Sequence, residues 1–318
     1  MKRVGSSTVL ALLVLSARAS MALHLPAVQV GDGCMSSVEI SRLTADIQTL
    51  VGAARWDALA QTAAQLQQRC PNAAPGHYWM GVADLRRGRL FASIRELRRA
   101  LQLADTPGYH LMLAEAYLFL NQRQFFHEEI AAVLTRAPEQ PGAQYLIGLY
   151  YYLVESNWEK AVGHFQQELA HDPNHFQAMC FLGLCYQLRG QNDQAEATFL
   201  NAVKTVDREK IESDQPFQLL ASLYLDGSRA ADALPYARRA VALSPRSAKN
   251  RFVLGKAAWG MGDQVTAVGA LQAAAELDPT LPDPHYLLVR IYRARGEEAK
   301  ARQEVNLFKM CKELYGTQ

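Results

Sequence analysis

The sequence predicts an all-α solenoid, a tandem array of helical hairpins, and three observations support this fold class. A pattern of apolar and small residues returns about every 34 residues along most of the chain. Glycines fall inside the predicted hairpins, and prolines follow them. The 318 residues are 49% hydrophobic and 20% charged, which is typical of a chain with a packed core and not of a disordered one.

The repeat is clearest from residue 182 to residue 202. Its defining residues are Leu182, Gly183, Tyr186, Gly190, Ala195, Phe199 and Ala202. The same offsets later give Leu254, Gly255, Ala258, Gly262, Ala267, Leu271 and Ala274. A small residue and a ring three positions apart share one face of a helix, so a second helix can approach that face closely. One hairpin cannot bury its own apolar face, and we therefore expect neighbouring hairpins to share a core.

A period of about 34 residues with this pattern resembles the tetratricopeptide-repeat family. The resemblance covers about seven units from Ala74 onward and implies an α-solenoid that winds as a right-handed superhelix, with the first helix of each unit on the concave side. The predicted organisation is a leader at 1–19 (alternative cleavage after 22), a linker at 20–35, a degenerate first repeat at 36–73, repeats at 74–298, and the end of the last repeat with a capping helix at 299–318.

The first residues have the pattern of an export signal. Lys2 and Arg3 precede the apolar run Val9–Leu15, and Ala17–Ala19 offers a small-x-small cleavage pattern. The apolar run is shorter than the roughly 20 residues that span a bilayer, and no later stretch reads as a membrane helix. We therefore expect an exported protein, periplasmic or secreted, without an integral membrane segment after the signal is removed.

Two of the five cysteines are placed for a possible disulfide. Cys34 opens one predicted helix and Cys70 closes the next, and these two ends lie side by side in an antiparallel hairpin. The alternative is a pair of buried or free thiols. Cys180 and Cys185 are five positions apart on one helix, which is too far for a bond, so we expect them to be packing residues.

Motifs with a catalytic mechanism are absent from the sequence, so we predict no enzyme, no catalytic residue and no cofactor. His164, Glu168 and His171 share a helical stripe and could bind a metal, but a solvated helix face is the favoured interpretation and no metal site is predicted. With 33 Lys and Arg against 31 Asp and Glu, nothing draws the whole chain to nucleic acid.

One basic cluster stands out in the second predicted unit. Its members are Arg86, Arg87, Arg89, Arg95, Arg98 and Arg99. Such a cluster could meet an acidic partner or lipid headgroups. A solvated turn and outer face is the favoured interpretation.

The family resemblance also implies which residues line a concave groove. The predicted peptide-binding residues are Tyr78, Leu111, Tyr145, Leu149, Tyr152, Leu184, Phe252, Lys256, Trp259, Tyr286 and Arg290. The middle of this set is apolar and aromatic, and rings offer a large contact area at low entropic cost. The far end also carries Lys249 and Arg293, which suit an acidic segment or a terminal carboxylate. Alternatively, these side chains pack between units or bury a terminal segment.

The leading functional hypothesis is a non-enzymatic scaffold that holds a peptide segment of a protein partner in this groove. By analogy at the level of the fold, it would serve the assembly of envelope or secreted complexes. A second hypothesis is an architectural subunit that binds through its convex face and its termini. An enzyme, metal-dependent or other, is the third.

Overall fold

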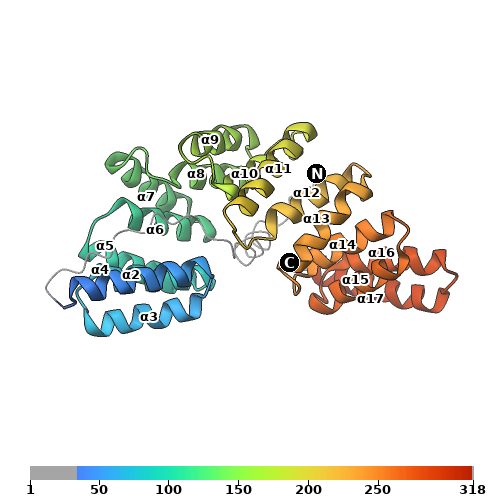
Figure 1. Ribbon diagram of the computed structural model, residues 1–318, viewed down its shortest axis with the longest axis horizontal. Coiled ribbons are helices and arrows are strands. Elements are labelled where there is room, and N and C mark those ends of the chain that lie inside the picture. Colours follow the sequence, from blue (N-terminus) through green and yellow to red (C-terminus); the bar gives the residue numbers. More distant parts are fainter. Residues whose placement is uncertain (1–33, 317–318) are drawn as a thin grey trace. The chain divides into compact units, whose positions relative to one another are not determined.

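The computed structural model describes residues 34–316, in which the chain forms sixteen α-helices and no strand (Figure 1). This confirms the predicted all-α solenoid of helical repeats. The predicted leader, and the linker up to residue 33, lie outside the described residues. The chain divides into two compact units, and the division falls between Cys185 and Tyr186, inside a predicted repeat and at a point that no sequence feature marks.

Unit 1 contains four complete hairpins and most of a ninth helix. Its helices are α2 (Ser37–Gly52), α3 (Trp56–Arg69), α4 (Ala74–Arg86), α5 (Leu90–Leu103), α6 (Pro107–Phe119), α7 (Arg123–Arg136), α8 (Ala143–Leu153), α9 (Trp158–His171) and α10 (Phe176–Leu188), whose last residues belong to unit 2.

Unit 2 continues with α11 and three hairpins. Its helices are α11 (Asn192–Arg208), α12 (Gln215–Asp226), α13 (Ala230–Leu243), α14 (Ala248–Gly260), α15 (Gln264–Leu277), α16 (Pro282–Ala294) and α17 (Glu298–Gly316). Helix α11 has 17 residues where α13 and α15 have 14. The second helix of this repeat is therefore longer than those of the two repeats that follow it.

The small residue of each first helix allows the second helix to approach. A Cβ atom placed on Gly148 would lie 2.6 Å from Cε1 of Phe165, and one on Gly255 would lie 2.6 Å from Cγ of Leu271. Real Cβ atoms do not come this close to a neighbour, so a larger residue at either position requires the neighbouring side chain to shift.

The turn inside each hairpin contains a residue with positive φ. Gly262 and Gly296 fill this role at φ +78° and +71°, as glycine does without steric cost. Other turns use Ala54, Asn121, Ser156 or Ser228, with φ between 50° and 58°. The turn geometry is therefore shared even where the glycine is not.

One second helix departs from the repeat in its core. Glu168 of α9 occupies the position that Ala202 and Ala274 hold in later repeats, and it is 2% exposed. Its carboxylate accepts the backbone N–H groups of Gly142 at 2.9 Å and Tyr145 at 3.1 Å. It thus caps the start of α8, where Gly142 has no side chain to do so.

The two outer hairpins are held together in different ways. In unit 1 a disulfide joins Cys34 to Cys70, with their Cα atoms 5.9 Å apart, and it packs against a small cluster that includes Leu66. In unit 2, α17 adds Ala301 to a larger cluster made with α14, α15 and α16. Cys180, which the sequence assigned to packing, is buried in α10.

Candidate functional site

In unit 1 the predicted binding stripe lies in the interior. Tyr78, Leu111, Tyr145 and Leu149 are between 2% and 6% exposed. Tyr78 stacks on Tyr109 with ring centroids 4.6 Å apart. Burial raises the pKa of Tyr78, and that of Tyr145, far above the ordinary value for tyrosine. These four side chains act as core in the structure.

The later part of the unit 1 stripe is half-buried. Tyr152 meets Phe181 edge to face at 5.4 Å, and the same Phe181 ring lies 6.1 Å from Tyr145. Leu184 is also half-buried. Burial raises the pKa of Tyr152 to about 12, so this hydroxyl stays protonated at physiological pH.

A buried ion pair that the sequence analysis missed lies among these rings. Arg86 donates to both carboxylate oxygens of Glu115, at 2.6 Å and 3.1 Å, and the two side chains are 9% and 4% exposed. The charges of this pair act on the hydroxyl groups of Tyr78 and Tyr145. A sequence signal existed, since Glu115 is the one charged residue in the apolar segment 111–119.

In helices α14 and α16 of unit 2 the equivalent stripe is half-buried or exposed and forms two matching rows. Helix α14 carries Phe252, Lys256 and Trp259, and α16 carries Tyr286, Arg290 and Arg293. We call these six residues the α14–α16 surface. Within each helix the spacing i, i+4, i+7 places the three side chains on one face. The rows are in register, because each α16 residue follows its α14 counterpart by one repeat.

Packing on the core fixes the rings of the α14–α16 surface. Phe252 and Trp259 are half-buried against a cluster that includes Leu287 and Ile291 of α16. Tyr286 is 53% exposed, and its ring lies 5.9 Å from that of Phe308 in α17. The sequence analysis did not include Phe308; the amphipathic pattern of the last helix was the available signal.

Most of the positive charge of the α14–α16 surface is not neutralised. Lys256 contacts Asp226 of α12 at 3.3 Å, and Gln187 donates to the other oxygen of that carboxylate at 3.1 Å. No carboxylate of the described residues forms an ion pair with Arg290 or Arg293, and both are exposed. The positive charge that the sequence predicted for the last repeats therefore lies on exposed side chains, those of Arg290 and Arg293.

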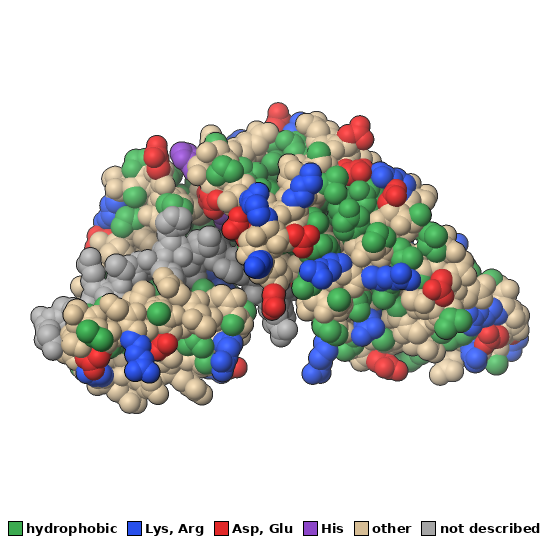
Figure 2. Space-filling view, in the orientation of Figure 1, with side chains coloured by type: hydrophobic (Ala, Val, Ile, Leu, Met, Phe, Trp, Pro, Cys, Tyr) green, Lys and Arg blue, Asp and Glu red, His purple; other side chains and the backbone are tan. Residues whose placement is uncertain are grey.

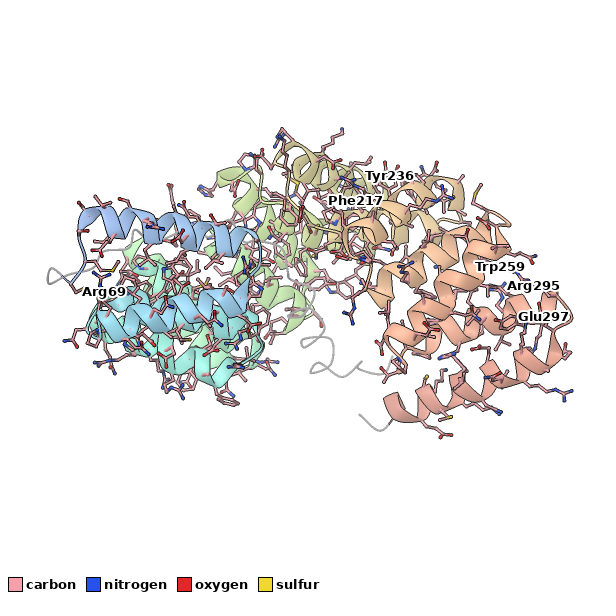
Figure 3. The ribbon with its side chains drawn as sticks, turned by 60° about the horizontal axis from the view of Figure 1, so that its bottom comes forward. Arg69, Phe217, Tyr236, Trp259, Arg295 and Glu297 are labelled. Carbon is pink, nitrogen blue, oxygen red and sulfur yellow. A yellow bond between two sulfur atoms is a disulfide. The ribbon has the colours of Figure 1, made fainter. Side chains whose placement is uncertain are left out.

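The figures show the setting of this surface. Lys and Arg side chains lie next to hydrophobic ones over the helices of unit 2 on the face drawn in Figure 2. Figure 3 shows Trp259 at the same end of the unit as Arg295 and Glu297, which belong to the turn between α16 and α17. Arg295 donates to the side chain of Gln264 at 2.8 Å, and this contact ties that turn to the start of α15.

The other candidate groups have structural contacts. Across the described part of the chain, no three His, Cys, Asp or Glu side chains gather as a metal site would require. His164 instead bonds to Gln144 at 2.9 Å and stacks on Tyr151. His171 is exposed, and Glu168 caps α8.

The predicted arginine cluster is divided among separate partners. Arg86 is buried with Glu115, and Arg87 pairs with Asp57 at 2.9 Å. Arg98 lies 5.8 Å from the centre of the Tyr117 ring. The cluster is therefore not one continuous basic surface.

Comparison with known proteins identifies the family of the repeats in the middle and later part of the chain. Residues 150–209 and 219–282 match the family model described as tetratricopeptide repeat. These residues of the chain are tetratricopeptide repeats. A comparison with curated proteins gave no match.

Several solved structures have a similar fold to this chain. One is a chain of the APC/C hetero-tetramer Cut9-Hcn1, with a TM-score of 0.65 and 14% identity over 77% of this chain and 48% of that one. Another is PilW, a type IV pilus biogenesis factor, with a TM-score of 0.56 and 17% identity over 68% and 98%. A thermophilic tetratricopeptide-repeat protein from Thermus thermophilus gives 0.51 and 23% over 59% and 100%. At these identities the likeness concerns the fold.

The tetratricopeptide-repeat fold is that of a scaffold for protein–protein interaction. None of the helices between residues 34 and 316 combines the length and the apolar character needed to cross a membrane.

Proposed function

We propose that this protein is a non-enzymatic scaffold that binds an extended peptide segment of a partner protein on the α14–α16 surface. The observation that carries the proposal is the coexistence of an exposed ring, Tyr286, with exposed arginines on a rigid pair of helices. In unit 1 the corresponding side chains of Tyr78, Leu111, Tyr145 and Leu149 belong to the core, which makes unit 2 the better candidate.

The surface suits recognition by contact. Phe252 and Trp259 are already held by the core, so little side-chain freedom is lost when a ligand covers them. Aromatic side chains at the centre of an interface and charged groups at its rim are the usual arrangement of peptide and protein binding sites. Binding is then a matter of complementarity, and no bond in the ligand is made or broken.

The proposal includes export and a role in assembling an envelope or secreted complex. Two features support export: the leader-like pattern of the first residues, and the disulfide between Cys34 and Cys70. Disulfides persist in oxidising compartments and are rare in reducing ones. Cell fractionation together with mass measurement of the purified protein, with and without a reductant, tests this part. An intracellular, fully reduced chain would contradict it.

Selection from a random library of displayed peptides tests the binding function directly. We expect the full-length protein to enrich binders whose affinity falls about tenfold or more in Tyr286→Ala, because this substitution removes the exposed ring of the site. Phe91→Ala is the matched control, since Phe91 is a ring with 79% exposure on α5 of unit 1.

The outcomes of the selection are decisive for the α14–α16 surface. Enriched peptides could instead bind Tyr286→Ala as tightly as the parent protein and lose affinity for Phe91→Ala. That result would place the binding site at Phe91 and not on the α14–α16 surface. Failure to enrich any peptide would overturn the proposed function.

A further inference from the structure

The charge of the α14–α16 surface specifies the chemistry of its ligand. Three cations occupy the surface, Lys256, Arg290 and Arg293, and among the described residues only Lys256 has a carboxylate partner. A fourth basic residue, Lys249, lies one helical turn before Phe252 and keeps an exposed surface; partial burial of its amine lowers the pKa of Lys249, and the carboxylate of Asp214 opposes this. In the free protein the charged groups of such a cluster are hydrated. A ligand that carries negative charge stabilises them by pairing with the unpartnered cations.

The structure already contains an example of the interaction. The carboxylate of Asp226 contacts the ammonium group of Lys256 at 3.3 Å, and both side chains are partly exposed, at 57% and 40%. An exposed pair of this kind contributes little to stability and can be exchanged for another partner. Asp226 thus occupies a place that a carboxylate of a ligand could take.

Resting on the proposed function, we infer that the bound segment is acidic and extended, with at least two carboxylates about three residues apart. Packed helices lie about 8–10 Å apart, which sets the separation between the α14 and α16 rows. An extended chain in the polyproline II conformation advances about 3.1 Å per residue and brings every third side chain to the same face, so a step of three residues spans the rows. One carboxylate then meets Lys256 and the next meets Arg290, while a ring or aliphatic side chain between them packs on Phe252 and Tyr286.

A defined pair of peptides tests the inference. The probe is a twelve-residue peptide with blocked ends, a Glu at every third position and one Tyr; its analogue has Gln in place of every Glu. We expect the acidic peptide to bind about tenfold or more tightly than the analogue, and the difference to shrink as salt is raised from about 0.05 M to about 0.5 M, because exposed charges are screened.

Variants assign the effect to named side chains. Replacing Arg290 and Arg293 together by Gln should weaken the acidic peptide about fivefold to tenfold and leave the Gln analogue unchanged. Asp226→Asn should strengthen the acidic peptide about twofold to threefold, because Lys256 loses its internal competitor. Arg302→Gln and Asp193→Asn are matched controls; both residues are exposed on second helices of the same unit, and neither should change binding.

The failure of this inference can be told apart from the failure of the proposed function. The enriched peptides could need Tyr286 for binding and yet be neutral or basic, or the Gln analogue could bind as tightly as the acidic probe. Either result would overturn the inference of an acidic ligand and leave the proposed peptide-binding surface in place. Weaker binding of the acidic probe to Asp226→Asn also overturns the inference. If no library peptide depends on Tyr286, both proposals fall.

Discussion

Tyr145 in unit 1 and Tyr286 in unit 2 hold the same position of their first helices, yet they are 6% and 53% exposed. Tyr145 has the rings of Phe165, His175 and Phe181 around it, whereas Tyr286 has only that of Phe308 among the described residues. The same helical position is therefore core where neighbouring repeats supply large side chains, and surface where they do not.

The charged residues of the two units show the same contrast. In unit 1 the pair Arg86–Glu115 is withdrawn from water, and in unit 2 the pair Lys256–Asp226 is open to it. A buried pair resists any change to one partner, whereas an exposed pair can be rearranged. We therefore expect unit 1 to depend on these positions for stability and unit 2 to use them for binding.

The largest expected effect comes from breaking the buried pair. Glu115→Gln removes the charge that compensates the Arg86 guanidinium, and the free energy of unfolding of unit 1 should fall by about 3–5 kcal/mol. Asp226→Asn in unit 2 should change stability by less than about 1 kcal/mol. Urea denaturation, with hydrogen exchange to assign each transition to a unit, measures both. Equal losses in the two variants would remove the contrast.

Removing the disulfide should have the next largest effect and should be confined to one end. Cys34→Ser combined with Cys70→Ser opens a loop with a sequence separation of 36, which is expected to cost about 2–4 kcal/mol. Amide hydrogens of α2 and α3 should exchange faster, while those of α16 and α17, which are joined by apolar packing, should not change. Unaltered exchange in α2 would show that packing alone closes this hairpin.

Glycine substitutions test whether the two units share the same close helix packing. Gly148→Ala and Gly255→Ala should each lower stability by about 1–3 kcal/mol, because the new methyl groups meet Phe165 and Leu271. Gly163→Ala and Gly269→Ala are the controls: both glycines lie inside second helices, with no neighbouring atom within 4 Å of an added Cβ. Those two should gain about 0.5–1 kcal/mol, as thermal melting can determine.

The smallest effect expected is a pH dependence of unit 1. Burial lowers the pKa of His175. The carboxylates of Glu168 and Asp172 raise that pKa, but by less than burial lowers it. Nδ1 of His175 also accepts the backbone N–H of Ala178 at 3.2 Å, which requires an unprotonated nitrogen.

The direction of this pH effect follows from proton linkage. Because the folded pKa is lower than the unfolded value of about 6.5, the unfolded chain binds more protons just below that pH. The free energy of unfolding should then fall as pH decreases below about 6.5 and be level above it. His175→Gln should flatten the profile measured by urea denaturation between about pH 5 and pH 8; an unchanged slope would assign the dependence to other groups.

Much of the fold was predictable because it depends on local spacing. Gly255 and Leu271 recur at fixed offsets, and Gly262 and Gly296 fill turns of positive φ, so helices, turns and pairing follow from the pattern. Ala54 and Ser228 adopt the same turn without the glycine signal. Glu168 as a cap for α8 was not predictable, because the groups it bonds lie on another helix, 23 and 26 positions away in the sequence.

The candidate site was only partly predictable for the same reason. Position within the repeat selected Phe252, Trp259 and Tyr286 together with Tyr78 and Tyr145, without distinguishing accessible from buried side chains. Whether the groove residues bind a peptide stays a prediction. Exposure in the structure favours the unit 2 members of the set.

The sequence by itself determined the tandem helical hairpins, because the spacing of small, apolar and turn residues acts over a few helical turns. Only the tertiary structure decided that Arg86 meets Glu115 across two helices and that the chain divides near Cys185. It also decided that Tyr78 and Tyr145 are buried while Tyr286 is exposed. The physical reason is that burial and ion pairing depend on which side chains arrive from other helices, and a linear pattern records only its own helix.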